Sequence, residues 1–79
     1  MLSTAREVLN ELRWRPGRRI ADAVLYVRDR LAPERHRVVS GADITALGHR
    51  TFDTASATIP YYKIARIEHR GRVLFERRD

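Results

Sequence analysis

The sequence predicts an α+β fold in which an N-terminal helix packs on a small, strongly bent antiparallel sheet, or partly open barrel, of five to six strands. Three observations support this prediction: one stretch with helical apolar spacing, a series of short strand-like runs between turn residues, and a hairpin pattern near the end of the chain. The 79 residues suit one small domain, so residues 1–79 are expected to form a single domain.

The helix is predicted to begin near Thr4 and to end before Pro16-Gly17. Apolar residues at positions 5, 8, 9 and 12 have i, i+3, i+4, i+7 spacing, which places them on one helix face. Thr4 and Glu7 have the spacing of a capping box, and Pro-Gly is a typical helix stop. A helix this short must pack on another element to be stable.

The strand-like runs follow the helix and are separated by turn residues. They are residues 23–27, continuing into 28–30, and then residues 35–39, 44–47 and 51–54. Residues 55–58 are weak in every propensity and are interpreted as a loop. Pro60 is expected to bend the chain before the next strand.

The final hairpin allows two registers. A two-residue turn sets Arg66 opposite Phe75, whereas a three-residue loop at 69–71, with its glycine in a left-handed bulge position, pairs Ile67 with Val73. Only the second register separates apolar from charged side chains. Because a one-residue slip would bury charge, the sequence favours the three-residue loop.

The formal net charge of +6 is concentrated in two segments. Residues 13–19 contain four arginines and no acidic residue, and residues 61–78 contain six cations against two glutamates. Concentrated positive charge is what a polyanion-binding surface needs.

The composition also excludes several classes. There is no cysteine, so disulfides and thiolate metal sites are absent, which fits a reducing compartment. No apolar run approaches the roughly 20 residues that span a membrane, and the first residues lack the apolar core of a secretion signal. We therefore expect a cytoplasmic protein that does not contact membranes.

Catalytic and metal-binding patterns are weak. The imidazoles of His36, His49 and His69 lack metal-ligand spacing and are expected to face solvent. The aspartates are scattered among arginines, and no glycine-rich phosphate loop occurs. No catalytic residue, metal or other cofactor is expected.

Two clusters have the chemistry of nucleic-acid binding. Arg13-Trp14-Arg15 sets an indole between two guanidinium groups, and the ring either stacks on an unpaired base or anchors the helix in the core. The core interpretation is favoured in so small a domain. In Tyr61-Tyr62-Lys63 one tyrosine is expected to pack inward, while the other points outward beside the lysine to contact a phosphate or a base.

An ordered set of motifs resembles the small RNA cyclic-group end recognition family over nearly the whole chain. The matching pieces are Leu12-Arg13-Trp14, Asp29-Arg30, Val39 to Ile44, Ile59-Pro60, Ile64, Ile67, and Gly71 to Arg77. The resemblance implies recognition of RNA ends, including 2′,3′-cyclic phosphates. Tyr62 and Lys63 replace the histidine and arginine that are usual in the family, and Phe75 replaces its closing tryptophan. The tyrosine can donate a hydrogen bond but carries no charge near neutral pH.

Together these features predict a non-catalytic RNA-binding domain that recognises single-stranded RNA termini in RNA processing or repair. One cationic hollow is expected to hold the phosphorylated end, lined by Arg13, Trp14, Arg30, Tyr62, Lys63 and Arg66. The alternative is a protein-interaction accessory subunit of an RNA-processing or nucleotidyltransferase complex, which binds its partner through an exposed strand edge or oligomerises there. A phosphoesterase is a third hypothesis, which would need one of the histidines as general base.

Overall fold

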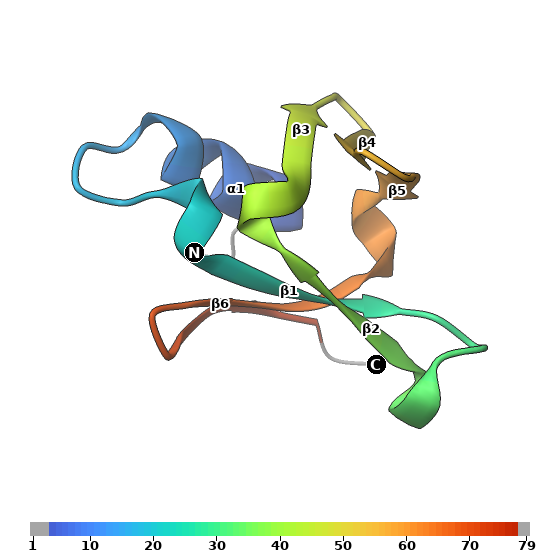
Figure 1. Ribbon diagram of the computed structural model, residues 1–79. Helices are drawn as coiled ribbons and strands as arrows, with labels where there is room; N and C mark the ends of the chain where they lie inside the picture. Colours follow the sequence, from blue (N-terminus) through green and yellow to red (C-terminus); the bar gives the residue numbers. More distant parts are fainter. Residues whose placement is uncertain (1–3, 78–79) are drawn as a thin grey trace.

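The computed structural model describes residues 4–77 and contains one α-helix and two antiparallel sheets (Figure 1). The helix α1 spans Ala5–Trp14. The larger sheet has the order β2-β1-β6-β7 and the smaller one the order β3-β4-β5. The strands are β1 (Ala23–Arg28), β2 (His36–Ser40), β3 (Ile44–Leu47), β4 (Thr51–Thr54), β5 (Thr58–Pro60), β6 (Ile64–His69) and β7 (Arg72–Glu76). The α+β class is confirmed, but the sheets do not close, so the barrel is not.

The helix forms as its sequence predicts. The Thr4 hydroxyl accepts a hydrogen bond from the Glu7 N–H (3.1 Å), and the Glu7 carboxylate accepts one from the Thr4 N–H (3.0 Å), which completes the capping box. The four apolar side chains of the predicted stripe are all buried. They pack with Leu25, Phe52 and Ile64, which are fully buried on the two sheets.

The prediction of five to six strands missed β5. Residues 58–60 pair with β4, with Pro60 opposite Thr51 and Ile59 opposite Phe52. Proline is tolerated here because β5 is an edge strand, so its missing N–H removes no ladder hydrogen bond on the outer side. A run of three residues has too few side chains to show alternation, which is why propensity alone did not reveal it.

The predicted three-residue loop of the last hairpin is wrong. Arg70 and Gly71 have φ values of 52° and 80°, as in a two-residue turn whose central residues are both left-handed. A bulge in β7 then shifts the register by one residue, so that Ile67 lies opposite Phe75. The bulge therefore separates apolar from charged side chains, which the sequence interpretation had attributed to the loop.

Four 3₁₀ turns lie within residues 4–77, one between α1 and β1 and three between strands, and the sequence interpretation did not include them. Two of them, Ile20–Asp22 and Gly41–Asp43, meet above β1. A Cβ atom at Gly41 would lie 1.8 Å from the carbonyl oxygen of Ile20, so only glycine permits this approach. The turn Tyr61–Lys63 leads from β5 of the smaller sheet into β6 of the larger one.

Candidate nucleic-acid interface

An open groove of about 980 Å³ lies between the β1–β2 hairpin and the segment Ala57–Lys63. One wall comes from the end of β1, the hairpin loop and the start of β2; the other comes from β5 and the Tyr61–Lys63 turn. Its cationic lining residues are Arg28, Arg30, Arg35, Arg37 and Lys63. The lining contains a single carboxylate, that of Asp29, so the groove is strongly positive.

The hairpin loop is held in place by its own hydrogen bonds. The Asp29 N–H donates to the Arg35 carbonyl (2.9 Å), and the Asp29 carboxylate accepts from the Leu31 N–H (3.0 Å). Glu34 and Arg35 both have positive φ, 58° and 63°, a conformation that costs about 1–3 kcal/mol per non-glycine residue. The loop thus holds Arg35 at the groove in a left-handed backbone conformation that residues other than glycine rarely adopt.

The opposite wall separates the two tyrosines as expected. Tyr61 is buried, and its hydroxyl donates to the Gly48 carbonyl oxygen at 2.8 Å. Burial raises the pKa of this hydroxyl above its ordinary value of 10.0. Tyr62 is 68% exposed and lines the groove beside Lys63. The inward tyrosine therefore anchors the turn, and the outward one presents an aromatic ring to the groove.

Arg77 supports this turn from the end of the chain's last strand. Its Nε donates to the Ile64 carbonyl at 3.2 Å, and its Nη2 donates to the Tyr61 carbonyl at 3.5 Å. These carbonyls flank Tyr62 and Lys63 on both sides. The Arg77 guanidinium also lies 5.4 Å from the Phe75 ring centroid, so the closing hairpin holds the turn that faces the groove.

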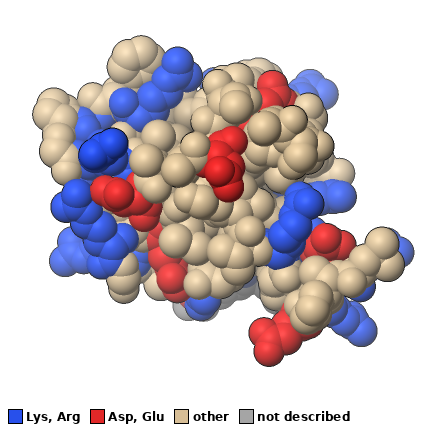
Figure 2. Space-filling model, in the orientation of Figure 1, with Lys and Arg blue, Asp and Glu red and all other residues tan. Residues whose placement is uncertain are grey.

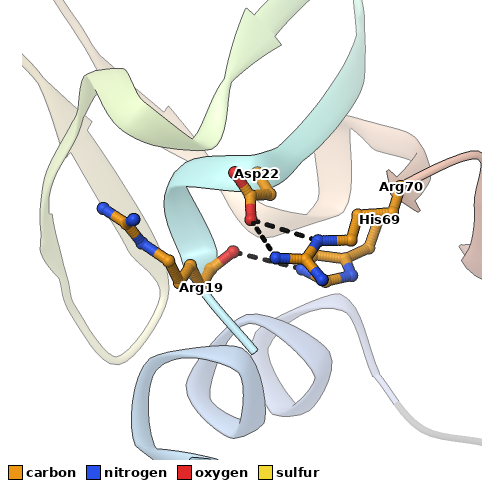
Figure 3. A network of polar contacts seen from close by, with 4 residues as sticks. All are labelled: Arg19, Asp22, His69 and Arg70. Carbon is orange, nitrogen blue, oxygen red and sulfur yellow. Dashed lines mark hydrogen bonds and ion pairs between the residues drawn. The ribbon is translucent and has the colours of Figure 1, made fainter. Parts of the chain in front are cut away.

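The three histidines occupy different environments. His36 lines the groove, with Nδ1 3.1 Å from the Glu34 carbonyl. Because a carbonyl oxygen only accepts, Nδ1 carries the hydrogen and Nε2 is left to contact a ligand. His49 is exposed and lies outside the groove lining. The expectation that all three face solvent is wrong for His69, which is buried at the C-terminal end of β6 and donates from Nε2 to the Arg19 carbonyl at 3.2 Å (Figure 3).

The structure brings together three of the six site residues predicted from the sequence. Arg30, Tyr62 and Lys63 line the groove. Arg13 and Trp14 lie at the end of α1, on the other side of the molecule from the β1–β2 hairpin (Figure 1). Trp14 is 73% exposed, so the core-anchor interpretation is wrong: at about 100° per residue it lies about 200° around the helix from Leu12, on the face opposite the buried stripe.

Arg66 lies on the outer face of the larger sheet. Its guanidinium stacks 4.3 Å from the Tyr26 ring centroid. It also forms ion pairs with Glu68 (3.2 Å) and Glu76 (3.9 Å). A single hollow holding all six predicted residues therefore does not form, and the charge of Arg66 is already balanced by two carboxylates.

Sequence reasoning missed Arg28, Arg35, His36 and Arg37 as lining residues. The sequence prediction considered only the two basic segments, residues 13–19 and 61–78. The rest of the chain has a net negative charge, which concealed the four arginines within residues 28–37. The antiparallel pairing of β1 with β2 sets Val27 opposite Arg37 and gathers these cations at one end of the sheet. A charge count across the hairpin would have found them.

On the face seen in Figure 2, a few cations lie at the upper right edge, and most of the positive charge lies in two groups. One covers the α1–β1 connection and the β6–β7 turn at the left, and the other lies at the right beside the β1–β2 hairpin.

Within residues 4–77, no three His, Asp or Glu side chains are placed to hold a metal ion. No helix in the same part of the chain has the length and apolar content to cross a bilayer.

The fold and the groove define a small basic α+β domain with an open, positively charged groove and an exposed aromatic ring. Residues 2–77 match the family described as the MJ1316 RNA cyclic group end recognition domain, and the chain belongs to this family. The resemblance seen in the ordered motifs is thereby confirmed, and the family's description indicates RNA end recognition. No curated protein and no solved structure matches the chain.

Proposed function

We propose that this protein is a non-catalytic RNA-binding domain whose groove recognises RNA termini ending in a phosphate, including a 2′,3′-cyclic phosphate, during RNA processing or repair. One observation carries the proposal: the exposed Tyr62 and four cations, Arg30, Arg35, Arg37 and Lys63, surround a groove whose lining contains one carboxylate. Like charges gathered this closely repel one another, and a bound phosphate relieves that repulsion.

The lining provides a role for each part of an RNA end. The arginine forks of Arg30 and Arg37 suit the paired oxygens of a phosphate, and Lys63 adds a point charge. Tyr62 offers either a ring face to the terminal base or its hydroxyl to the phosphate. A base inside a duplex is already paired and stacked, so the ring favours single-stranded ends.

The proposal is tested by fluorescence anisotropy with labelled four-nucleotide RNAs that differ only at the 3′ end: 2′,3′-cyclic phosphate, 3′-phosphate or 3′-hydroxyl. A blunt duplex is the fourth probe. We expect the two phosphorylated ends to bind about tenfold more tightly than the hydroxyl end, with affinity falling steeply between about 50 and 200 mM salt.

Arg30→Ala should remove most of the preference for a terminal phosphate and leave the fold intact. Arg50→Ala is the matched control, since Arg50 is exposed and lies outside the groove lining. Equal affinity for the hydroxyl end, the blunt duplex and the phosphorylated ends would contradict an end-recognition groove.

The alternative function, an accessory subunit that binds an RNA-processing or nucleotidyltransferase enzyme, is favoured by the strand edges. β2 and β7 form the two edges of the larger sheet. Val38 and Val73 on these strands are 61% and 51% exposed, and such edges accept a partner strand. A stable oligomer on a sizing column, together with no salt-sensitive RNA binding, would favour this function.

A phosphoesterase acting on the cyclic phosphate would need a general base. His36 is the imidazole that lines the groove. We expect the cyclic-phosphate RNA to remain unchanged after prolonged incubation with the protein. Conversion to a monophosphate that is abolished by His36→Ala would instead identify an enzyme.

A further inference from the structure

A second basic surface lies at the end of α1, away from the groove. We call it the helix-end surface. It consists of Arg13, Trp14, Arg15, Arg18 and Arg19. Trp14 is 73% exposed, and the Arg13 guanidinium lies 5.1 Å from its ring centroid. An indole this exposed contributes little to the core, so its presence needs another explanation.

Hydrogen bonds hold the segment that carries the helix-end surface in a fixed position. A turn at Gly17 (φ 80°) folds the chain back, and the Arg18 N–H donates to the Arg15 carbonyl at 3.3 Å. The connection is then tied to the larger sheet, because buried His69 donates to the Arg19 carbonyl at 3.2 Å. Figure 3 shows the Arg19 side chain pointing away from this contact.

A second tie fixes the same connection. Arg70, in the β6–β7 turn, donates from Nε and Nη2 to the Asp22 carboxylate at 3.3 and 3.1 Å (Figure 3). The backbone of Arg19 and the side chain of Asp22 are thus held to the hairpin. The cations are therefore presented from an anchored segment.

The charge on this surface is largely unbalanced. Glu11 pairs with Arg15 at 2.8 Å. Within the described residues, no carboxylate forms an ion pair with Arg13, Arg18 or Arg19. The helix dipole favours a cation such as Arg13 in the last turn, but this effect fades within one turn and does not account for Arg18, Arg19 or the exposed indole.

We infer that the helix-end surface binds the single-stranded body of the same RNA whose terminus the groove holds. Arginines that contact successive phosphates, beside an aromatic ring on which a base stacks, are the combination that binds single strands without sequence preference. This inference rests on the proposed function, because the groove sets the position of the terminus. The groove then recognises the RNA end, and the helix-end surface adds affinity for the rest of the strand.

The size of the molecule sets the RNA length that reaches both surfaces. The longest dimension is 36 Å, and the end of α1 lies on the opposite side of the molecule from the β1–β2 hairpin in Figure 1. A stacked strand advances about 3.4 Å per nucleotide, so roughly ten nucleotides span this length. A four-nucleotide RNA should reach only the groove, whereas a twelve-nucleotide RNA should reach both surfaces.

The test compares these two lengths, both with a 3′-phosphate, on the wild-type protein. We expect the longer RNA to bind about tenfold more tightly, since its second contact is intramolecular. In Arg13→Gln/Arg19→Gln this advantage should disappear, while affinity for the short RNA stays within twofold. The salt slope for the long RNA should fall by about 1.4, the value for two phosphate contacts on a single strand.

Arg6→Gln/Arg50→Gln is the matched control, because it removes the same charge from exposed positions outside both surfaces. Trp14 is the single tryptophan, so its emission reports directly on base stacking. The long RNA should quench it and the short RNA should not. Trp14→Ala should weaken binding of the long RNA about tenfold.

The outcomes separate this inference from the proposed function. If the short RNA binds with end preference but the long RNA gains nothing and leaves Trp14 emission unchanged, the helix-end inference is overturned and the groove stands. If the short RNA does not bind at all, the proposed function fails. Emission that responds to poly-aspartate but not to RNA would assign the surface to an acidic protein and overturn the inference.

Discussion

The groove and the outer face of the larger sheet both carry arginine, yet they differ in what surrounds it. On the outer face, Arg66 stacks on Tyr26 and is balanced by Glu68 and Glu76. In the groove, the lining includes one carboxylate and, besides Arg28, the cations Arg30, Arg35, Arg37 and Lys63. The two glutamates offset the charge of Arg66, whereas the groove keeps positive charge that an external anion can balance.

An arginine indicates a binding surface only where neighbouring carboxylates do not already offset its charge. Partly exposed ion pairs contribute little to stability, but they remove the positive potential that would attract RNA. The outer face is therefore a poor phosphate site despite its arginine. Two predictions below test this difference, beginning with the larger effect, and a third concerns the helix start, which lies outside both regions.

Charge reversal should separate the two regions most clearly. Arg37→Glu/Lys63→Glu in the groove should lower the affinity for 3′-phosphorylated RNA by about 100-fold, because it replaces attraction by repulsion at the terminal phosphate. Arg66→Gln on the outer face should change that affinity less than twofold. It should instead lower the free energy of unfolding by about 1 kcal/mol through loss of the ring contact.

Anisotropy measures the first effect, and urea unfolding measures the second. If Arg66→Gln weakens RNA binding as much as the groove variant does, the distinction between balanced and unbalanced arginines is wrong.

A more moderate effect is expected at Arg77, which contacts the groove only through the turn it supports. Arg77→Lys keeps the charge but cannot bond the Ile64 and Tyr61 carbonyls with the same fork. We expect RNA affinity to fall about fivefold, because Tyr62 and Lys63 lose their fixed position. Arg72→Lys is the control, because Arg72 is exposed on β7 and lies outside the groove lining. An unchanged affinity in Arg77→Lys with normal unfolding would show that the turn needs no such support.

The smallest effect is expected at the helix start, which takes part in neither region. Hydrogen bonds from Thr4 hold the pKa of Glu7 below its ordinary value of 4.5. A carboxyl whose pKa is lowered by folding stabilises the protein above its unfolded pKa, and this stabilisation is lost as pH falls through the folded pKa.

Glu7→Gln keeps a capping residue but removes the charge. It should therefore lower the melting temperature slightly at pH 7 and not at pH 3, with RNA affinity unchanged. A loss of equal size at both pH values would show that the ionised carboxylate has no special role.

Interactions between near neighbours were predictable from the sequence. The stripe at positions 5, 8, 9 and 12, the capping box of Thr4 and Glu7, and the strands Ile44–Leu47 and Thr51–Thr54 all form with the expected residues. The inward and outward tyrosines were also predicted correctly. Each of these depends on periodicity or on bonds spanning a few residues.

Interactions across the fold were not predictable in the same way. The two-residue turn alone would pair Ile67 with Leu74, and the bulge in β7 shifts this pairing to Ile67 with Phe75. His69 is buried because the end of β6 meets the Arg19 carbonyl, and Trp14 is exposed because it lies on the helix face opposite the buried stripe. The bulge and the burial of His69 depend on contacts between elements that lie far apart in the chain, whereas the exposure of Trp14 follows from helical periodicity alone.

The amino-acid sequence by itself determined the class of fold, the helix and its cap, the basic character and the family. Only the tertiary structure decided which cations share a groove, which are balanced by carboxylates, and that Arg13 and Trp14 lie on a surface of their own. Capping and periodicity act over a few residues, whereas the potential at a site depends on side chains that strand pairing brings together.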